Sequence, residues 1–530
     1  MMRKILLLIY VTLRILFSQK ISSPEKDYPV NFPPSFHPLP PDDIRNLLLR
    51  AAEIPVQDNS DGLFSSVKTP RLYLACYEIT HDKKYLNMAF TALTSTWNRF
   101  HHSQTKLLYK IDASGTPQPE ESVMSYIYSL FIWQLAWYLQ LAPNNEINAI
   151  LEEFGDAVWK YCSPNQQGWI GELKPISGEI TRPSANDYYI EWTIWCWLEA
   201  FAATGAEKYA DRARKMTSFF WNLRDPSTDI VPGSASWDQT KYKKTRTSIA
   251  HIGFFIGSMF RGGLCTGDSF FIDLGLKAGA AFEKYYWDEE LGRYINWCDT
   301  DGAKHPLYSI GIEQLDGFLL YAAYTDDQKI SEHIYRHFQF IWQRIWSIEK
   351  KTFFTLRLKD NVFVPAQAES VNRHPAAFLG NTSYFLGNQV YSKYGTLGYL
   401  EAFGSYLTWY NDNKKDLSDE QWYGIYNDWI KSTAFIGKPR LIASTISCRG
   451  LHRIWGKNDF EINVAITNNQ NKLTAGHLIF FLRKIPDGKR YKTNRGILKV
   501  IDKNDPLMSR VELNIELRPK EIFTVQIQPE

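Results

Sequence analysis

A helical hairpin that recurs about every sixty residues constrains the fold of this chain more than any other feature. Four segments share the end of an apolar helix, a tight polar turn and the start of an amphipathic helix: "YEITHDKKYLNMAF", "FAATGAEKYADRAR", "LCTGDSFFIDLGLKA" and "YAAYTDDQKISEHI". The turn threonines are Thr80, Thr204, Thr266 and Thr325. The segment "LQLAPNNEINAIL" supplies the hairpin between Thr80 and Thr204, and "YSKYGTLGYLEAF", near residue 392, supplies the sixth hairpin.

The two helices of each hairpin differ in their hydrophobic pattern. The first is apolar on most faces, as in "YIEWTIWCWLEAFAA", and the second is one-sided, as in "AEKYADRARKMTSFF". Helices that are apolar all round are buried, and one-sided helices cover them. Six or seven such hairpins predict a mainly α fold, an (α/α)6–7 toroid or barrel of inner and outer helices. An irregular helical bundle is the alternative.

The pattern changes from residue 438 onward. Segments such as "DFEINVAITNN", "GHLIFFLRK" and "IFTVQIQPE" alternate apolar and polar residues between Asn, Gly and Lys turns. Alternation of this kind predicts β-strands. We therefore expect a catalytic barrel over residues 20–437 and a small antiparallel β domain of the sandwich type over 438–530. The β domain carries no cluster of Asp, Glu, His or Tyr, and we expect it to be an accessory module.

The N-terminus, "MMRKILLLIYVTLRILFSQK", combines a basic start with an apolar run that Arg14 interrupts. This pattern predicts a signal peptide over residues 1–19 and a secreted or periplasmic protein, with a membrane-anchored N-terminus as the alternative. No later segment has the length and apolar character of a membrane span, so we expect no stable membrane insertion. The net charge of +3 does not favour a nucleic-acid partner, and the six cysteines lack the C-x-x-C spacing of a zinc site.

Long connections rich in Gly, Asp and Trp join each outer helix to the next inner helix. They should gather at one end of the barrel, beside the N-termini of the inner helices, and form a cleft there. Aromatic residues make up 15% of the chain, and aromatic rings stack on sugar rings. Trp221, Trp237, Trp287 and Trp297 lie in or beside the connections 223–246 and 288–308. They should either stack on sugars or pack the connections onto the barrel.

The ionisable and polar side chains of these connections are the candidate site residues. As substrate-binding residues we expect Arg182, Asn186, Tyr188, Glu191, Trp237, Lys304, His305, Glu313, Asn372, Arg373, His374 and Tyr384. His251, in "TRTSIAHIGFFIGSMFRGG", lies about 200° round its helix from Ile249, on the side opposite the Ile face. That side should face the central cavity of a barrel. A buried structural histidine is the alternative.

A histidine, tyrosines, several cations and an asparagine in an aromatic cleft suit elimination across a uronic acid. The C5 proton of a uronate is very weakly acidic, so its removal requires a base and a positive charge that neutralises the carboxylate. A tyrosine hydroxyl can protonate the departing O4 oxygen. No metal or other cofactor is needed when the protein supplies the positive charge.

A toroid with a histidine on an inner helix, a tyrosine more than fifty residues later and a C-terminal β module resembles the (α/α)-toroid polysaccharide lyases. Alginate and glucuronan lyases, and polysaccharide lyase family thirty-eight, are the members it most resembles. The resemblance implies a polysaccharide substrate, His251 as the base, Tyr308 as the acid, and Arg246 or Arg293 as the group that neutralises the carboxylate. Several lyases of this shape carry an asparagine where this chain has Ala250.

Three other functions stay open at this point. A glycoside hydrolase on the same barrel, of the unsaturated glucuronyl hydrolase type, would use Asp187, Glu191 or Glu313 as paired carboxylates. A uronate C5-epimerase shares the proton abstraction with the lyase. A sugar-binding surface protein with an inactive barrel is the third.

Overall fold

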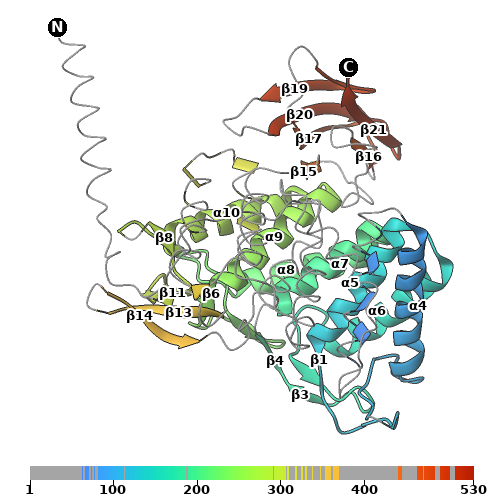
Figure 1. The fold of residues 1–530 in the computed structure, drawn as a ribbon, viewed down its shortest axis with the longest axis vertical. Coiled ribbons are helices and arrows are strands. Elements are labelled where there is room, and N and C mark those ends of the chain that lie inside the picture. Colours follow the sequence, from blue (N-terminus) through green and yellow to red (C-terminus); the bar gives the residue numbers. More distant parts are fainter. Residues whose placement is uncertain are drawn as a thin grey trace.

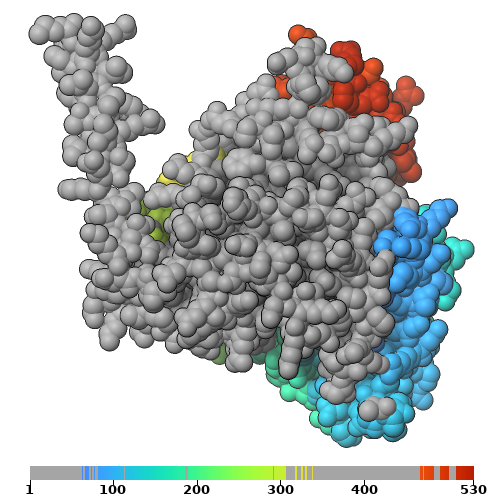
Figure 2. All heavy atoms as spheres, in the orientation of Figure 1, coloured from blue at the N-terminus to red at the C-terminus, as the bar shows by residue number. Residues whose placement is uncertain are grey.

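The computed structural model describes residues 82–308 except 113, 187, 188, 291 and 306, together with scattered positions before 82 and between 317 and 337. It also describes strands between 346 and 368 and at 440–444, and most of 462–530. Helices fill the body of the molecule (Figure 1). In the space-filling view, the C-terminal strands and the first helices lie on the same side (Figure 2). The predicted signal peptide lies outside the described residues and stays a prediction.

Three complete hairpins and one preceding helix make up the described part of the barrel. They are α4 (Lys83–Phe100), α5 (Ser125–Leu141) with α6 (Asn145–Cys162), α7 (Tyr189–Thr204) with α8 (Glu207–Asn222), and α9 (Ile249–Thr266) with α10 (Ser269–Tyr286). The inner helices α5, α7 and α9 contact one another in sequence order, and α6, α8 and α10 pack behind them. The predicted mainly α toroid is confirmed. Among the described helices, none has the length and apolar character needed to cross a membrane.

The turn threonines Thr204 and Thr266 make the same hydrogen bonds to the backbone in two successive hairpins. Thr204 and Thr266 each donate a hydroxyl hydrogen bond to the carbonyl oxygen four residues earlier, at 2.8 and 2.6 Å. Each hydroxyl also accepts the backbone N–H two residues later. The glycine between, Gly205 or Gly267, has φ of 69°, a left-handed conformation that glycine adopts without strain. The outer helices α6 and α10 then begin with Asn144 and Asp268 as N-caps.

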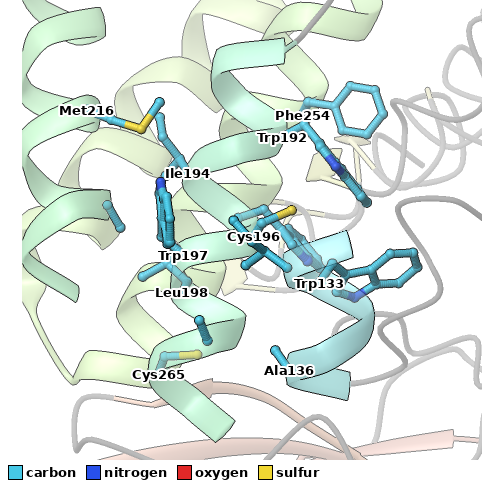
Figure 3. Close-up of a cluster of buried hydrophobic side chains, with 14 of the residues drawn as sticks. Trp133, Ala136, Trp192, Ile194, Cys196, Trp197, Leu198, Met216, Phe254 and Cys265 are labelled. Atoms are coloured by element: carbon cyan, nitrogen blue, oxygen red, sulfur yellow. The ribbon is translucent and has the colours of Figure 1, made fainter. Parts of the chain in front are cut away.

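Large aromatic side chains hold the inner helices together. Trp133 of α5 meets Trp192 of α7 edge to face at 5.4 Å, and Trp192 meets Phe254 of α9 at 6.1 Å. Figure 3 shows these three side chains arriving from three neighbouring helices. Trp197 faces outward from α7 and stacks on Tyr209 of α8 at 5.8 Å. Since each such ring buries about 150–250 Å² of surface, this core fixes the spacing of the helices.

Short antiparallel sheets form the connections that lead into the inner helices. They are β1 (Val123–Met124), β2 (Glu172–Leu173) and β3 (Ile180–Arg182); β4 (Ser184–Asn186) and β5 (Ser234–Ser236); β6 (Arg246–Ser248), β9 (Trp297–Asp299) and β10 (Lys304–His305); β7 (Trp287–Asp288) and β8 (Arg293–Tyr294); and β11 (Leu307–Tyr308), β12 (Trp346–Ser347), β13 (Thr352–Lys359) and β14 (Val362–Ala368). Strands β1 and β6 lead directly into α5 and α9. Most of these sheets lie along one end of the barrel (Figure 1).

The C-terminal strands form two antiparallel sheets. One has the order β15 (Arg440–Ser444), β17 (Thr474–Arg483), β20 (Met508–Leu517) and β19 (Ile497–Ile501), and the other β16 (Ile462–Thr467), β21 (Ile522–Pro529) and β18 (Tyr491–Thr493). Strand β15 contacts α9, and Arg510 donates to the carbonyl oxygen of Tyr324, whose ring lies 5.4 Å from Phe260. The β domain therefore packs near the C-terminal part of α9, away from the short sheets. The predicted boundary at residue 438 stays a prediction.

Candidate active site

A buried histidine–carboxylate pair joins two inner helices at the end where the short sheets lie. The Nδ1 atom of His251 lies 2.9 Å from Oε1 of Glu191, and the two side chains are 5% and 1% exposed. His251 belongs to the first turn of α9 and Glu191 to the first turn of α7. The histidine side chain thus contacts the neighbouring inner helix. The pairing assigns Glu191 a place beside the histidine that the sequence analysis did not foresee.

Hydrogen bonds on both sides hold this pair in position. The hydroxyl of Ser258, two turns along α9, donates to the carbonyl oxygen of Glu191 at 2.8 Å. Upstream of His251, Thr247 donates to the carbonyl oxygen of Val231 at 2.7 Å and its own carbonyl oxygen accepts from Tyr286 at 3.0 Å. The first turn of α9 therefore cannot shift without breaking contacts to three other segments.

A second buried pair lies deeper between the same two helices. Arg261 of α9 donates to both carboxylate oxygens of Glu199 on α7, at 2.7 and 3.1 Å, and both side chains are fully buried. Gln140 of α5 donates to the same carboxylate at 3.1 Å. Each of the two glutamates of α7 is thus hydrogen-bonded to a side chain of α9. The deeper pair lies eight to ten residues further along both helices and serves as a structural counterpart to the first.

Cations surround one carboxylate on the strands next to His251. Asp299 of β9 lies 2.7 Å from Nε2 of His305, 3.3 Å from Nζ of Lys244 and 3.8 Å from Nε of Arg246. Burial pushes the pKa of Asp299 upward, but the hydrogen bonds from His305 and Lys244 outweigh it and hold this pKa below its usual value. Asp299 therefore stays ionised and contacts two cations, Lys244 and Arg246, as well as the His305 ring. The sequence analysis listed Arg246 and His305 but missed this shared partner.

Arg293 and Lys304 lie on the neighbouring strands. Arg293 of β8 is close enough to His337 that its charge, added to the larger effect of burial, lowers the pKa of His337 to about 3. His337 accepts a hydrogen bond from the backbone N–H of Tyr294 at 3.1 Å. Lys304 of β10 donates to the carbonyl oxygen of Trp287 at 2.5 Å. The described contacts of these two cations are thus with the β7–β8 hairpin and its surroundings.

Arg182 and Trp237 contact the strands that precede α7 and the start of that helix. The guanidinium of Arg182 lies 3.3 Å from Glu172 of β2 and over the ring of Tyr189, the first residue of α7. Trp237 is half-buried, and its carbonyl oxygen accepts a hydrogen bond from Asn165 at 2.6 Å. Both contact segments that lead into α7. Arg182 thus contacts the helical turn that carries Glu191, and Trp237 contacts Pro183 on the segment before it.

The tryptophans of the connections divide into two kinds. Trp221 is buried and stacks on Phe255 at 5.7 Å, and Trp287 is buried and stacks on His333 at 3.6 Å. These two pack the connections onto the barrel. Trp237 and Trp297 are half-buried and so are less completely packed than Trp221 and Trp287.

Several predicted site residues cannot be placed by their side chains. Asn186 lies on β4 and Tyr308 on β11, where it pairs with Leu356 of β13, and only their backbones are described. The predicted residues outside the described part are Asp187, Tyr188, Glu313, Asn372, Arg373, His374 and Tyr384. Within the described residues, no three His, Cys, Asp or Glu side chains are arranged to hold a metal ion. Cys162, Cys196, Cys265 and Cys298 are buried.

No protein-family model matches the chain, and no curated protein matches it. Solved structures match it in fold. A D-mannose isomerase matches at 15% identity over 68% of this chain and 96% of its own, with a TM-score of 0.50. A cellobiose 2-epimerase from Bacillus thermoamylovorans matches at 12% identity over 69% and 98%, with a TM-score of 0.48. A sugar epimerase from a ruminal bacterium matches at 14% identity over 69% and 91%, also at 0.48. The likeness to the D-mannose isomerase shows a shared fold.

Proposed function

We propose that this chain is an enzyme that cleaves a uronic-acid-containing polysaccharide, such as alginate or glucuronan, by β-elimination. The observation that carries the proposal is the buried Glu191–His251 pair at the N-terminal ends of two inner helices. The D-mannose isomerase on this fold acts on a sugar, which agrees with a carbohydrate substrate. Secretion through a signal peptide at residues 1–19 belongs to the same proposal.

The pair suits a base that removes a proton from carbon. A histidine that donates Nδ1–H to a carboxylate is held in the tautomer whose lone pair is on Nε2. When His251 takes the proton, Glu191 stabilises the imidazolium that forms, at a hydrogen-bond distance of 2.9 Å. The step forms an Nε2–H bond and breaks the C5–H bond of the uronate. The electron pair spreads onto the uronate carboxylate as an enediolate.

Positive charge near the enediolate is the second requirement. Arg246 belongs to the strand that leads directly into α9, three residues before the helix begins, and we assign it to the uronate carboxylate. Arg293 is the alternative. Tyr308 follows the β10 strand of the same region, and we assign it to protonate O4 as the C4–O4 bond breaks. The C4=C5 double bond that results marks the product as an elimination product.

A uronate C5-epimerase is the second candidate, because the same base can start either reaction. The described geometry is less favourable to a hydrolase. Of its three candidate carboxylates, Glu191 is already hydrogen-bonded to His251, so it is placed to act on the histidine rather than on the glycosidic oxygen.

The test is a panel of uronate polymers assayed for unsaturated products by ultraviolet absorbance and for new reducing ends. We expect both signals together on at least one polymer, and neither in His251→Ala. Reducing ends without unsaturation would indicate a hydrolase and contradict the proposal. Exchange of the C5 proton with solvent, with neither signal, would indicate the epimerase.

A further inference from the structure

A basic loop with the sequence "KYKKTR", residues 241–246, precedes α9 directly. We infer that this basic loop binds the carboxylates of an acidic polysaccharide chain beside the catalytic pair. The inference rests on the proposed function and adds a surface to it: a binding track that recognises the polymer rather than the sugar being cleaved.

The loop concentrates positive charge on the surface. Lys241, Lys243, Lys244 and Arg246 are all exposed, although the whole chain carries a net charge of only +3. Four carboxylates are nearby: Asp299 and Asp301, which pair with Lys244, Asp225, which hydrogen-bonds to Tyr242, and Asp238, three residues before the loop. Counting Lys304 of β10, five cations lie near four carboxylates, which leaves an excess of one positive charge. An anionic polymer is attracted to such a region, and a neutral one is not.

The loop is held in shape by its contacts to the β9–β10 turn. The hydroxyl groups of Tyr242 and Thr300 lie 2.9 Å apart, and the backbone N–H of Thr300 donates to the carbonyl oxygen of Thr245 at 2.9 Å. Lys244 contacts Asp301 at 2.5 Å and Asp299 at 3.3 Å. Because the loop is already ordered by these contacts, little conformational entropy is lost when a ligand binds.

Lys241 and Lys243 of the loop can bind a ligand, because other side chains of the loop make its contacts to the protein. The side chains of Tyr242, Lys244 and Arg246 engage Thr300, Asp301 and Asp299. Lys241 and Lys243 alternate with them, are exposed, and have no carboxylate within ion-pair distance among the described residues. The ring of Tyr242 between them is 36% exposed and offers an apolar face to a sugar.

The basic loop is close enough to His251 for one polymer chain to reach both. Three residues of strand and the first residues of α9 separate Arg246 from His251. At about 3.3 Å per strand residue and 1.5 Å per helix residue, this separation is at most roughly 13 Å. Lys243 and Lys241 lie three and five residues before Arg246, which adds at most about 10 and 17 Å of extended chain. A uronate polymer with one sugar at His251 can therefore place the carboxylates of sugars further along the same chain at Lys243 and Lys241.

The test compares the double variant Lys241→Ala/Lys243→Ala with a matched double variant, Lys83→Ala/Lys277→Ala. Lys83 begins α4 and Lys277 lies on the outer helix α10; both are exposed, so the control removes the same charge elsewhere. Each change is made in the His251→Ala background, so that binding is measured without turnover. The probes are polyglucuronate, alginate, a neutral glucan of similar length and single-stranded nucleic acid, titrated by calorimetry at two salt concentrations.

We expect the Lys241/Lys243 variant to bind its preferred polyuronate about fivefold to thirtyfold more weakly, in line with two exposed charge contacts, and to lose part of the salt dependence. The control should bind as the parent does. Equal binding by both variants, or no polyuronate binding by the parent, would overturn the inference. So would nucleic acid that binds as tightly as the polyuronate, because the surface would then be a general polyanion site. If the wild-type enzyme neither eliminates nor epimerises but Lys241 and Lys243 still determine polyuronate binding, the proposed function fails and this inference stands.

Discussion

Replacing Glu191 by glutamine should slow turnover strongly and leave the fold intact. Glu191 bonds to His251 at 2.9 Å, with both side chains almost fully buried. A hydrogen bond to a charged group contributes about 1.5–3 kcal/mol. That energy stabilises the transition state, in which His251 becomes charged. Since 1.4 kcal/mol is about a factor of ten in rate, kcat should fall roughly 10- to 150-fold, and KM should change little.

Glu199→Gln is the matched control. Glu199 lies on the same helix, is equally buried and bonds to a cation of α9, but it lies eight residues further along, about 12 Å away. Losing its charge beside Arg261 should reduce the free energy of unfolding by up to about 3–5 kcal/mol, since an unpaired buried charge is costly. Below the unfolding transition, kcat of this variant should stay within about threefold of wild type.

Initial rates at saturating polyuronate and denaturant unfolding of each variant make the comparison. The double variant His251→Ala/Glu191→Gln should be no slower than His251→Ala alone, because the two residues act as a unit. Wild-type kcat in Glu191→Gln would refute the reasoning, as would an equal loss of kcat in Glu199→Gln. Inactivity of Glu191→Gln beside an active His251→Ala would point to a hydrolase.

Three further predictions concern packing, pH and the proposed acid. In Gly317→Ala the added methyl carbon would lie 2.0 Å from the carbonyl oxygen of Gly253 and 2.6 Å from the backbone nitrogen of Gly257. We therefore expect the free energy of unfolding to fall by about 1–3 kcal/mol. An unchanged denaturation midpoint would contradict this. Burial, aided by Arg293, lowers the pKa of His337 from 6.5 to about 3, so the unfolded chain binds a proton that the native state does not, and stability should fall as pH drops from about 6.5 toward 3. His337→Asn should reduce the extra loss of stability between pH 7 and pH 5 by about 2 kcal/mol in denaturant titrations, and an unchanged pH dependence would argue against it. Tyr308→Phe should lower kcat by roughly a hundredfold or more with little change in thermal midpoint, and full activity would remove Tyr308 from the mechanism.

The repeat in the sequence was sufficient to predict the toroid because its physical causes are local. All-round apolar helices must be buried, and the threonine–glycine turns at Thr204 and Thr266 reverse the chain in the same way. The helical period predicted that His251 faces the central cavity, and that orientation stays a prediction; the structure shows a buried side chain that bonds to Glu191 of the neighbouring inner helix. What the sequence analysis did not foresee was the partner of His251, since Glu191 had been placed among the substrate ligands and the hydrolase carboxylates.

A signal for that partner was present in the sequence. Neighbouring inner helices place residues about one repeat apart next to each other. Glu191 and His251 are 60 residues apart, Glu199 and Arg261 are 62 apart, and Ser129 and Thr193, whose hydroxyls lie 2.7 Å apart, are separated by 64. Polar residues one repeat apart on all-apolar helices are therefore candidates for pairs. The group around Asp299 gives no such signal, because it depends on the register of β6 with β9.

The fate of the C5 hydrogen tests the central claim most directly. A uronate oligosaccharide carrying deuterium at C5 is incubated with the wild-type protein and with His251→Ala. The masses of the products are then measured by mass spectrometry. We predict that the wild type releases an unsaturated product that has lost the deuterium, and that His251→Ala forms this product at least about a hundredfold more slowly. A saturated product that keeps the deuterium, or an equal rate in His251→Ala, would contradict proton abstraction by His251.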